Sequence, residues 1–142
     1  MGEAAHPDTL RIYGDTSKRG EHVGVGYCIK TRRDGEVAVI ERGGRPLDAD
    51  VTSLVGEYEA LLYGVEQAMK HDPKYVTLHS DNRSVVQAVR SEWTTPPHVE
   101  YVEKIHERVS DFEEWRIFLV LRSENRIAHE QSRRACPIDA QD

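Results

Sequence analysis

The chain has 142 residues, of which 38% are hydrophobic and 31% charged, a balance typical of a folded globular protein and not of a disordered one. No apolar run approaches the roughly 20 residues that a membrane-spanning helix needs, so we expect no contact with a membrane. The net charge of −6 argues against a strong non-specific grip on nucleic acid. The length predicts a single domain over residues 1–142, with a core from about 9 to 135 and short polar tails.

The two cysteines, Cys28 and Cys136, have neither the spacing of a metal site nor that of a redox pair. The N-terminal residues lack the charged start and apolar stretch of a secretion signal. These features predict a reduced, cytoplasmic protein, with a monomer as the default oligomeric state.

The first half of the chain has the alternation and turn residues typical of strands. Residues 9–15 predict a first strand, residues 16–21 a polar turn, and residues 23–30 a second strand. Residues 33–35, Arg-Asp-Gly, are a hairpin signal, after which residues 36–42 alternate as a third strand. The pattern therefore predicts three antiparallel strands in succession.

The remainder of the chain alternates between helical and strand patterns. A loop over 43–50 leads to a helix over 53–70, whose apolar residues recur every three or four positions. A strand over 75–80 precedes a helix over 82–92. The last expected elements are a helix that begins at Thr95-Pro96-Pro97, a strand over 115–121 and a helix capped by Ser123 that runs to about Cys136.

The order βββαβααβα predicts an α/β fold with a mixed five-stranded sheet flanked by helices. Hairpin-linked strands pair antiparallel, whereas strands joined through helical crossovers pair parallel. Ligands of such sheets gather at the carboxyl ends of adjacent parallel strands.

Three acidic residues stand where the predicted strands end or a helix begins. Asp15 closes the first strand, Glu57 lies in the first turns of the helix over 53–70, and Asp81 follows the strand over 75–80. Carboxylates that converge repel one another unless a cation lies between them, and magnesium takes oxygen ligands of this kind. Metal pairs held in this way drive phosphoryl transfer and hydrolysis, so convergence of the three predicts a metal-dependent nuclease.

The order of elements and four short motifs resemble type 1 ribonuclease H and its reverse-transcriptase-associated relatives. The family's Tyr-x-Asp-Gly-Ser reads Tyr-Gly-Asp-Thr-Ser at 13–17, and its Ala-Glu-Tyr-x-Ala-Leu reads Gly-Glu-Tyr-Glu-Ala-Leu at 56–61. Its Ser-Asp-Ser reads Ser-Asp-Asn at 80–82. Its Glu-Asn-x-x-Ala-Asp reads Glu-Asn-Arg-Ile-Ala-His at 124–129. Each motif alone is weak, but four in the right order are specific.

The resemblance implies an endonuclease that cuts the RNA strand of an RNA–DNA hybrid and leaves 5′-phosphate and 3′-hydroxyl ends. Two divalent cations, Mg²⁺ or Mn²⁺, would lie between the carboxylates of Asp15, Glu57 and Asp81. RNA would be told from DNA through contacts to its 2′-hydroxyl groups.

The chain departs from the family at the fourth acid, because His129 stands where an aspartate is expected. Glu130 is adjacent, but a neighbour on a helix points about 100° away and is a poor substitute. An imidazole can bind metal and favours transition metals over magnesium. We therefore treat His129 as a catalytic and metal-site residue and expect manganese to support more activity; the alternative is a surface histidine without a role.

Polar residues beside the acids are the nearest candidates for contacts to a nucleic-acid strand. The family's Thr-Asn-Asn before the acidic helix reads Thr-Ser-Leu at 52–54, which removes two amides. Two rival functions remain open: a non-catalytic or weakly active nucleic-acid-binding module, and a nuclease of the same fold with a different substrate. The candidate strand-binding residues are Thr16, Ser17, Thr52, Ser53 and Asn82.

Overall fold

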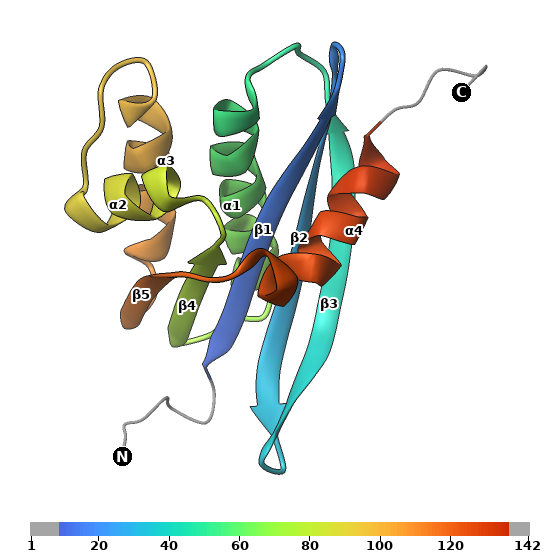
Figure 1. Cartoon of the computed structure of the whole chain (residues 1–142). Helices are drawn as coiled ribbons and strands as arrows, with labels where there is room; N and C mark the ends of the chain where they lie inside the picture. The colour runs from blue at the N-terminus through green and yellow to red at the C-terminus, as the bar shows by residue number, and fades with distance from the viewer. Residues whose placement is uncertain (1–8, 137–142) are drawn as a thin grey trace.

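The computed structural model describes residues 9–136, which form one five-stranded sheet with helices on both faces (Figure 1). The tails expected before residue 9 and after residue 135 lie, apart from Cys136, outside the described residues. The elements are β1 (Leu10–Arg19), β2 (His22–Arg33), β3 (Glu36–Leu47), α1 (Ser53–Met69), β4 (Tyr75–Ser80), α2 (Arg83–Ser91), α3 (Val99–Val109), β5 (Glu114–Leu119), the 3-10 helix η1 (Arg122–Asn125) and α4 (Arg126–Ala135).

The sheet has the strand order β3-β2-β1-β4-β5 and is mixed, as the sequence predicts. The pairs β1–β2 and β2–β3 are antiparallel, and the pairs β1–β4 and β4–β5 are parallel. The hairpin predicted between the second and third strands is confirmed, because Asp34 and Gly35 both adopt positive φ angles, 52° and 83°. The α/β class and the order of elements are therefore confirmed.

The main core lies between the sheet and the helices α1, α2 and α3. Ile12, Leu78 and Ile117, from three adjacent strands, pack there with the apolar stripe of α1, including Tyr58, which is 1% exposed. The opposite face of β1 and β2 carries a smaller cluster in which Tyr13 and Cys28 contact Ala128 of α4. Figure 1 shows α4 crossing this second face. None of the described helices combines the length and the apolar composition that crossing a membrane requires.

Two predicted strand ends are wrong. β1 continues to Arg19, where the sequence suggested a turn from residue 16, and β3 continues to Leu47, where it suggested a loop from residue 43. The glycines and Pro46 in the second stretch favour a loop, but β3 is an edge strand, where a proline need not donate to the ladder. The two strands therefore extend the antiparallel half of the sheet well beyond the predicted limits.

Two predicted helix starts are also wrong. Ser123 does not cap the last helix, because it lies inside η1, and α4 begins only at Arg126. The prolines at 96 and 97 precede α3, which begins at Val99 with His98 as its N-cap. A turn precedes α3 and the 3-10 helix η1 precedes α4, where the sequence pattern predicted that a capping residue would start each helix directly.

Glycines in β2 and β3 let α4 lie unusually close to the sheet. A β-carbon added to Gly26 would lie 2.3 Å from the backbone nitrogen of Ser132, and one added to Gly24 would lie 2.4 Å from the Ser132 carbonyl oxygen. Gly44, opposite Gly26 in the register of the two strands, would bring a β-carbon to 2.7 Å from the Gln131 carbonyl oxygen. These three glycines let the backbone of α4 pack directly against β2 and β3, and they thereby set the distance between that helix and the sheet.

His79 of β4 is an interior residue. It is 9% exposed, its Nε2 lies 2.8 Å from Thr77 Oγ1, and its ring stacks on that of Tyr13 with 4.4 Å between centroids. Burial, followed by the charges of Arg11 and Lys30, lowers the pKa of His79 to about 4. The ring is therefore neutral in the folded protein at neutral pH.

We expect His79 to make the fold less stable in mild acid. Its folded-state pKa lies below the 6.5 of the unfolded chain, so the unfolded state takes up a proton first as the pH falls from 6.5 towards 4. At pH 5 this linkage amounts to a loss of roughly 2 kcal/mol in the free energy of unfolding. Urea unfolding at pH 7.5 and 5.0 should show a smaller loss for His79→Gln than for wild type, and equal losses would rule out this origin.

Candidate active site

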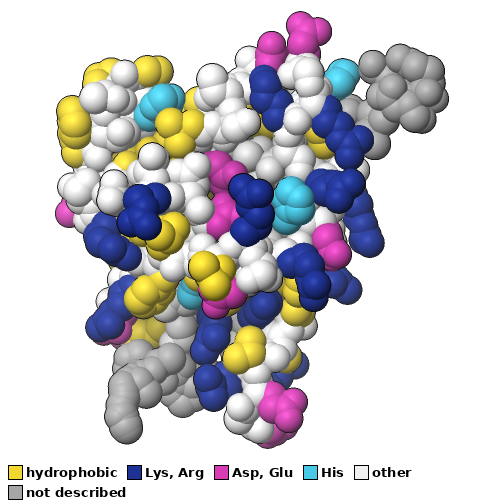
Figure 2. All heavy atoms as spheres, viewed as in Figure 1, with side chains coloured by type: hydrophobic (Ala, Val, Ile, Leu, Met, Phe, Trp, Pro, Cys, Tyr) yellow, Lys and Arg dark blue, Asp and Glu magenta, His cyan; other side chains and the backbone are white. Residues whose placement is uncertain are grey.

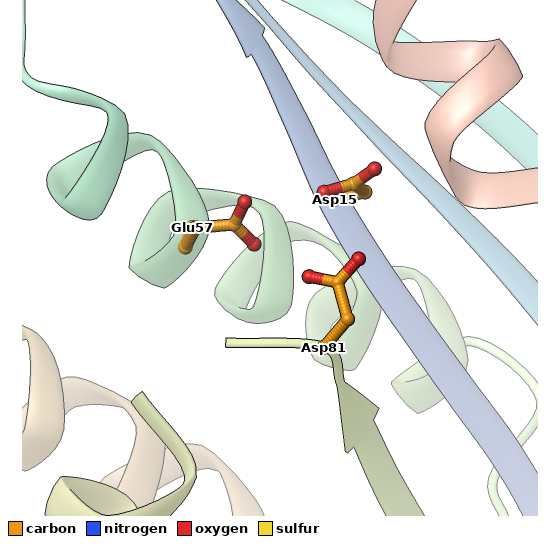
Figure 3. A group of neighbouring side chains, drawn as sticks. All are labelled: Asp15, Glu57 and Asp81. Atoms are coloured by element: carbon orange, nitrogen blue, oxygen red, sulfur yellow. The ribbon is translucent and has the colours of Figure 1, made fainter. Parts of the chain in front are cut away.

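The three acids singled out in the sequence converge on one point (Figure 3). Asp15 comes from β1, Glu57 from α1 and Asp81 from the residue that follows β4. One carboxylate oxygen of each lies within 4.8 Å of the others, and Asp15 is only 5% exposed. Figure 3 shows the three side chains pointing toward one another.

The position of Asp15 in the sheet differs from the expected strand end. Asp15 lies inside β1, opposite Gly26 of β2. The parallel pairing of β1 with β4 stops at Tyr13 and His79, two residues before Asp15. Beyond that point the chain leaves β4 at Asp81, so both carboxylates lie where the parallel pair separates. The carboxylates therefore lie at the carboxyl end of the parallel pair, as predicted, although the strand β1 itself does not end there.

Glu57 is held by a close approach of α1 to β1. Thr52 caps the helix by accepting a hydrogen bond from the backbone nitrogen of Val55 at 3.2 Å, which places Glu57 one turn further along. A β-carbon on Gly14 would lie 3.0 Å from the backbone of Ala60, and one on Gly56 only 2.4 Å from Thr16 Oγ1. The two glycines therefore allow the contact that brings Glu57 beside Asp15.

Asp81 is positioned by its two neighbours. Ser80, which is 2% exposed, accepts a hydrogen bond at its hydroxyl from the backbone nitrogen of Asn82 at 3.1 Å. Asn82 is the N-cap of α2 and accepts from the backbone nitrogen of Val85 at 3.0 Å. These bonds fix the turn between β4 and α2, so the Asp81 carboxylate is held at the carboxyl end of β4.

The cluster disfavours its own negative charge. Burial raises the pKa of Glu57 to about 10, with further contributions from Asp15 and Asp81. Burial and then the charge of Asp81 raise the pKa of Asp15. Glu57 Oε1 is buried and has no hydrogen-bond partner among the described residues. A set of acceptor oxygens with an unpartnered buried member fits a hard divalent cation, which would both neutralise the carboxylates and satisfy that oxygen.

His129 of α4 contacts this cluster directly. Its Nδ1 lies 2.7 Å from Asp15 Oδ2, and its side chain is 42% exposed. When Asp15 is ionised its carboxylate can only accept, so Nδ1 donates this bond and Nε2 is the other ring nitrogen left for further contacts. Glu130 is exposed, as expected for a neighbour on the other side of the helix. The structure therefore places the imidazole, and not the adjacent acid, beside the carboxylates.

The candidate strand-binding residues are mostly engaged within the fold. Thr16 Oγ1 donates to the Gly24 carbonyl oxygen at 3.0 Å, and Ser17 Oγ lies 2.8 Å from Ser132 Oγ. Thr52 and Asn82 are helix N-caps. Ser53, at the start of α1, is exposed. Four of the five thus have a structural role beside the site.

Two further residues hold the site together and were not singled out as site residues from sequence. Asn125, 1% exposed, donates from Nδ2 to the Gly14 carbonyl oxygen at 2.9 Å, next to Asp15. Ser132, fully buried, donates from Oγ to the His129 carbonyl oxygen at 2.7 Å. Asn125 belongs to the fourth motif, which was the available signal; no local pattern marks Ser132.

Comparison with solved structures identifies the fold. The chain is similar to ribonuclease H1 from the halophilic archaeon Halobacterium salinarum, with a TM-score of 0.80, 23% identity, and coverage of 89% of this chain and 96% of that one. It is similar to the N-terminal ribonuclease H domain of rv2228c from Mycobacterium tuberculosis, with a TM-score of 0.76, 21% identity, and coverage of 89% and 95%.

A third similar structure is LC11-RNase H1, solved in complex with an RNA/DNA hybrid, with a TM-score of 0.76, 22% identity, and coverage of 89% and 95%. No curated protein sequence matches the chain. A sequence model described as reverse transcriptase-like matches residues 14–135, which include the three carboxylates and His129. With the ribonuclease H-like architecture of its sheet and helices, the chain therefore belongs to the reverse transcriptase-like family.

Proposed function

We propose that the chain is a metal-dependent endoribonuclease that hydrolyses the RNA strand of RNA–DNA hybrids. The observation that carries this proposal is the convergence of Asp15, Glu57 and Asp81 within 4.8 Å, with a buried Glu57 oxygen that has no partner. The family and the ribonuclease H-like fold support it, as does the RNA/DNA hybrid bound to LC11-RNase H1. The products would carry 5′-phosphate and 3′-hydroxyl ends.

The three carboxylates would hold two divalent cations, Mg²⁺ or Mn²⁺. When bound, such a pair supplies an activated water and charge stabilisation for the leaving oxygen. Asp15, buried and inside β1, fixes the position of the site relative to the sheet. His129 holds Asp15 Oδ2 through Nδ1, and a carboxylate oxygen of Asp15 lies within 4.8 Å of Asp81 and Glu57. His129 therefore orients a ligand and presents its Nε2 at the site border.

An end-labelled RNA–DNA hybrid incubated with the protein and either Mg²⁺ or Mn²⁺ tests the proposal, with Asp15→Asn as the paired variant. We expect fragments of the RNA strand that are absent with the variant. Intact hybrid under both metals, from folded wild-type protein, would contradict the proposal.

A second function, a nucleic-acid-binding module with little or no turnover, is favoured by the imidazole at the fourth acidic position. This protein would hold the hybrid in a gel-shift experiment and leave it intact with both metals. Labelled duplex RNA and single-stranded RNA in the same assay distinguish a third function, a nuclease of this fold with a different substrate.

We expect His129 to set the metal preference. An imidazole favours transition metals, whereas a carboxylate suits magnesium. Hence His129→Asp should raise the ratio of the cleavage rate in Mg²⁺ to that in Mn²⁺ by about tenfold. Changes to a metal ligand, or to a residue that hydrogen-bonds to one, have effects of this size. Cleavage rates of both proteins across a metal titration give this ratio. An unchanged ratio and unchanged rates would leave His129 without a role in the site.

A further inference from the structure

A basic cleft lies on the α4 face of the sheet, beside the acidic centre. It has a volume of about 330 Å³ and runs between the strands β1 and β2 and the start of α4. Figure 2, which views this face, shows Lys and Arg side chains spread around and below an acidic patch near its middle. The side chains that line the cleft and bear on its chemistry are Arg11, Tyr13, Lys30, Ser123, Glu124 and Arg126.

The register of the sheet brings two of the cations together. Arg11 of β1 is the direct cross-strand partner of Lys30 of β2, and Lys30 Nζ lies 4.8 Å above the ring of Tyr13. Side chains at positions 11 and 13 of one strand point to the same face, so Arg11, Lys30 and Tyr13 form the floor. Arg126, exposed at the first position of α4, faces them from the other wall.

The three cations make no ion pair within the described part of the chain. None of the ion pairs among residues 9–136 involves Arg11, Lys30 or Arg126. The lining has one acid, Glu124, whose Oε1 accepts the backbone N–H of Leu121 at 2.8 Å, so the cleft has three cations against one carboxylate. Like charges gathered in one hollow disfavour each other unless an anion joins them. In a chain of net charge −6, such a group is a specific feature and not the result of a basic composition.

The cleft has a fixed position relative to the carboxylates. Arg11 and Asp15 are four residues apart on β1, or about 13 Å at the usual rise of a strand. Asn125, at the end of η1 and next to Arg126, is bonded to the Gly14 carbonyl oxygen, so the far wall is tied to the same strand. At about 3.4 Å of helix axis per nucleotide, the separation of about 13 Å between Arg11 and Asp15 corresponds to a few nucleotides.

We infer that the cleft binds a phosphodiester group of the nucleic acid, a few nucleotides from the point of cleavage. The inference rests on the proposed function, because it takes nucleic acid to be the substrate class. Arg supplies paired donors that suit phosphate oxygens, Lys a point charge, and the exposed Ser123 hydroxyl a further donor. Such a contact is independent of sequence and positions the strand on the protein. It gives this acidic protein a local binding site for the sugar-phosphate backbone of the nucleic acid.

The binding of a labelled RNA–DNA hybrid tests the inference. All proteins carry Asp15→Asn, so that cleavage does not consume the probe. We expect Lys30→Gln/Arg126→Gln to weaken binding about tenfold and to lower the slope of log affinity against log salt by about 1, between roughly 50 and 200 mM. The charge-retaining pair Lys30→Arg/Arg126→Lys should keep most of the affinity.

The matched control removes two charges elsewhere. Lys70, at the end of α1, and Lys104, on α3, are exposed and belong to helices on the other side of the sheet. Lys70→Gln/Lys104→Gln should leave both the affinity and the salt slope close to those of the parent. Thermal unfolding of each protein verifies that the variants fold.

A hybrid with one uncharged methylphosphonate linkage, moved step by step along each strand, locates the contact. One position should weaken binding to the parent and have no effect on Lys30→Gln/Arg126→Gln. Equal losses for the cleft and control variants, or the absence of such a position, would overturn the inference. Absence of hybrid binding by the parent would overturn it as well. The cleavage assay judges the proposed nuclease separately, since wild type can cut the hybrid whether or not the cleft contributes.

Discussion

Glu57→Gln is expected to make the metal-free protein more stable while lowering its cleavage activity at least a hundredfold. The pKa of Glu57 is raised from 4.5 to about 10 by burial and by Asp15 and Asp81. A carboxyl group whose folded-state pKa lies above its unfolded value costs stability increasingly as the pH rises above 4.5. At neutral pH this cost is on the order of 3–4 kcal/mol. A glutamine has the same shape and removes it.

Thermal unfolding at pH 7.5, with EDTA or with Mn²⁺, measures both parts of this expectation. The wild type should gain stability from the ion, because a ligand that binds only the folded state raises its unfolding temperature. Glu57→Gln should start higher in EDTA and gain less from Mn²⁺. Activity should fall by at least a hundredfold, as expected when an electrostatic contribution to the transition state is removed.

Glu59→Gln is the matched control for this prediction. Glu59 is on the same helix, two residues along, and lies beside Tyr101 on α3, away from the carboxylate cluster. The same chemical change there should leave the metal-dependent gain and the activity near those of wild type. If Glu57→Gln is no more stable than wild type in EDTA, the acids do not strain the metal-free fold.

The order of elements could be predicted from the sequence because each element carries its own local signal. The apolar stripe gives α1 within one residue of its observed ends, and the run 75–80 gives β4 without error. The parallel pairing followed from the helical crossovers. Local patterns of this kind also brought Asp15, Glu57 and Asp81 to one end of the sheet.

The extent of β3 could not be predicted, because its glycines are required by packing against a helix that is distant in the sequence. Gly43, Gly44 and Pro46 have low strand propensity and resemble a loop. In the structure Gly44 lies against the backbone of α4, and Pro46 is opposite Gly24 on the edge of the sheet. A requirement for close packing, set by a helix more than 80 residues later in the sequence, overrides local propensity here.

Two departures from the family motifs turn out to be related in space. The motifs have glycine at position 16 and alanine at position 56, where this chain has Thr16 and Gly56. A β-carbon at position 56 would lie 2.4 Å from Thr16 Oγ1 and 3.1 Å from its β-carbon. The glycine in α1 therefore makes room for the threonine in β1. Each difference weakens its motif in the sequence, whereas together they keep Glu57 beside Asp15.

The role of α4 was the part of the site least accessible to sequence. The position of His129 followed from the fourth motif, but its contact with Asp15 depends on how closely α4 lies on the sheet. That height is set by Gly24, Gly26 and Gly44 beneath the helix. The alternation of glycine at 24 and 26 marks one face of β2, which is a signal for close packing that local analysis passes over.

Gly26→Ala is therefore expected to destabilise the fold and to impair the site together. The new β-carbon would lie 2.3 Å from the Ser132 nitrogen and 2.4 Å from the Ala128 carbonyl oxygen, both of them backbone atoms. Neither can move unless the whole helix rises from the sheet. Overpacking of this kind costs about 3 kcal/mol or more. Because α4 carries His129, its 2.7 Å contact with Asp15 should lengthen as well.

Urea unfolding and hybrid cleavage measure the two effects, with Gly20→Ala as the control. Gly20 has a φ of 58° and no atom within 4 Å of a β-carbon, so alanine there costs only the left-handed conformation, roughly 1 kcal/mol. Gly26→Ala should lose several times more stability, and its rate should fall even where it is fully folded. A loss no greater than that of Gly20→Ala would mean that α4 moves freely over β2. The contact of His129 with Asp15 would then not depend on the close packing of α4 on Gly24, Gly26 and Gly44.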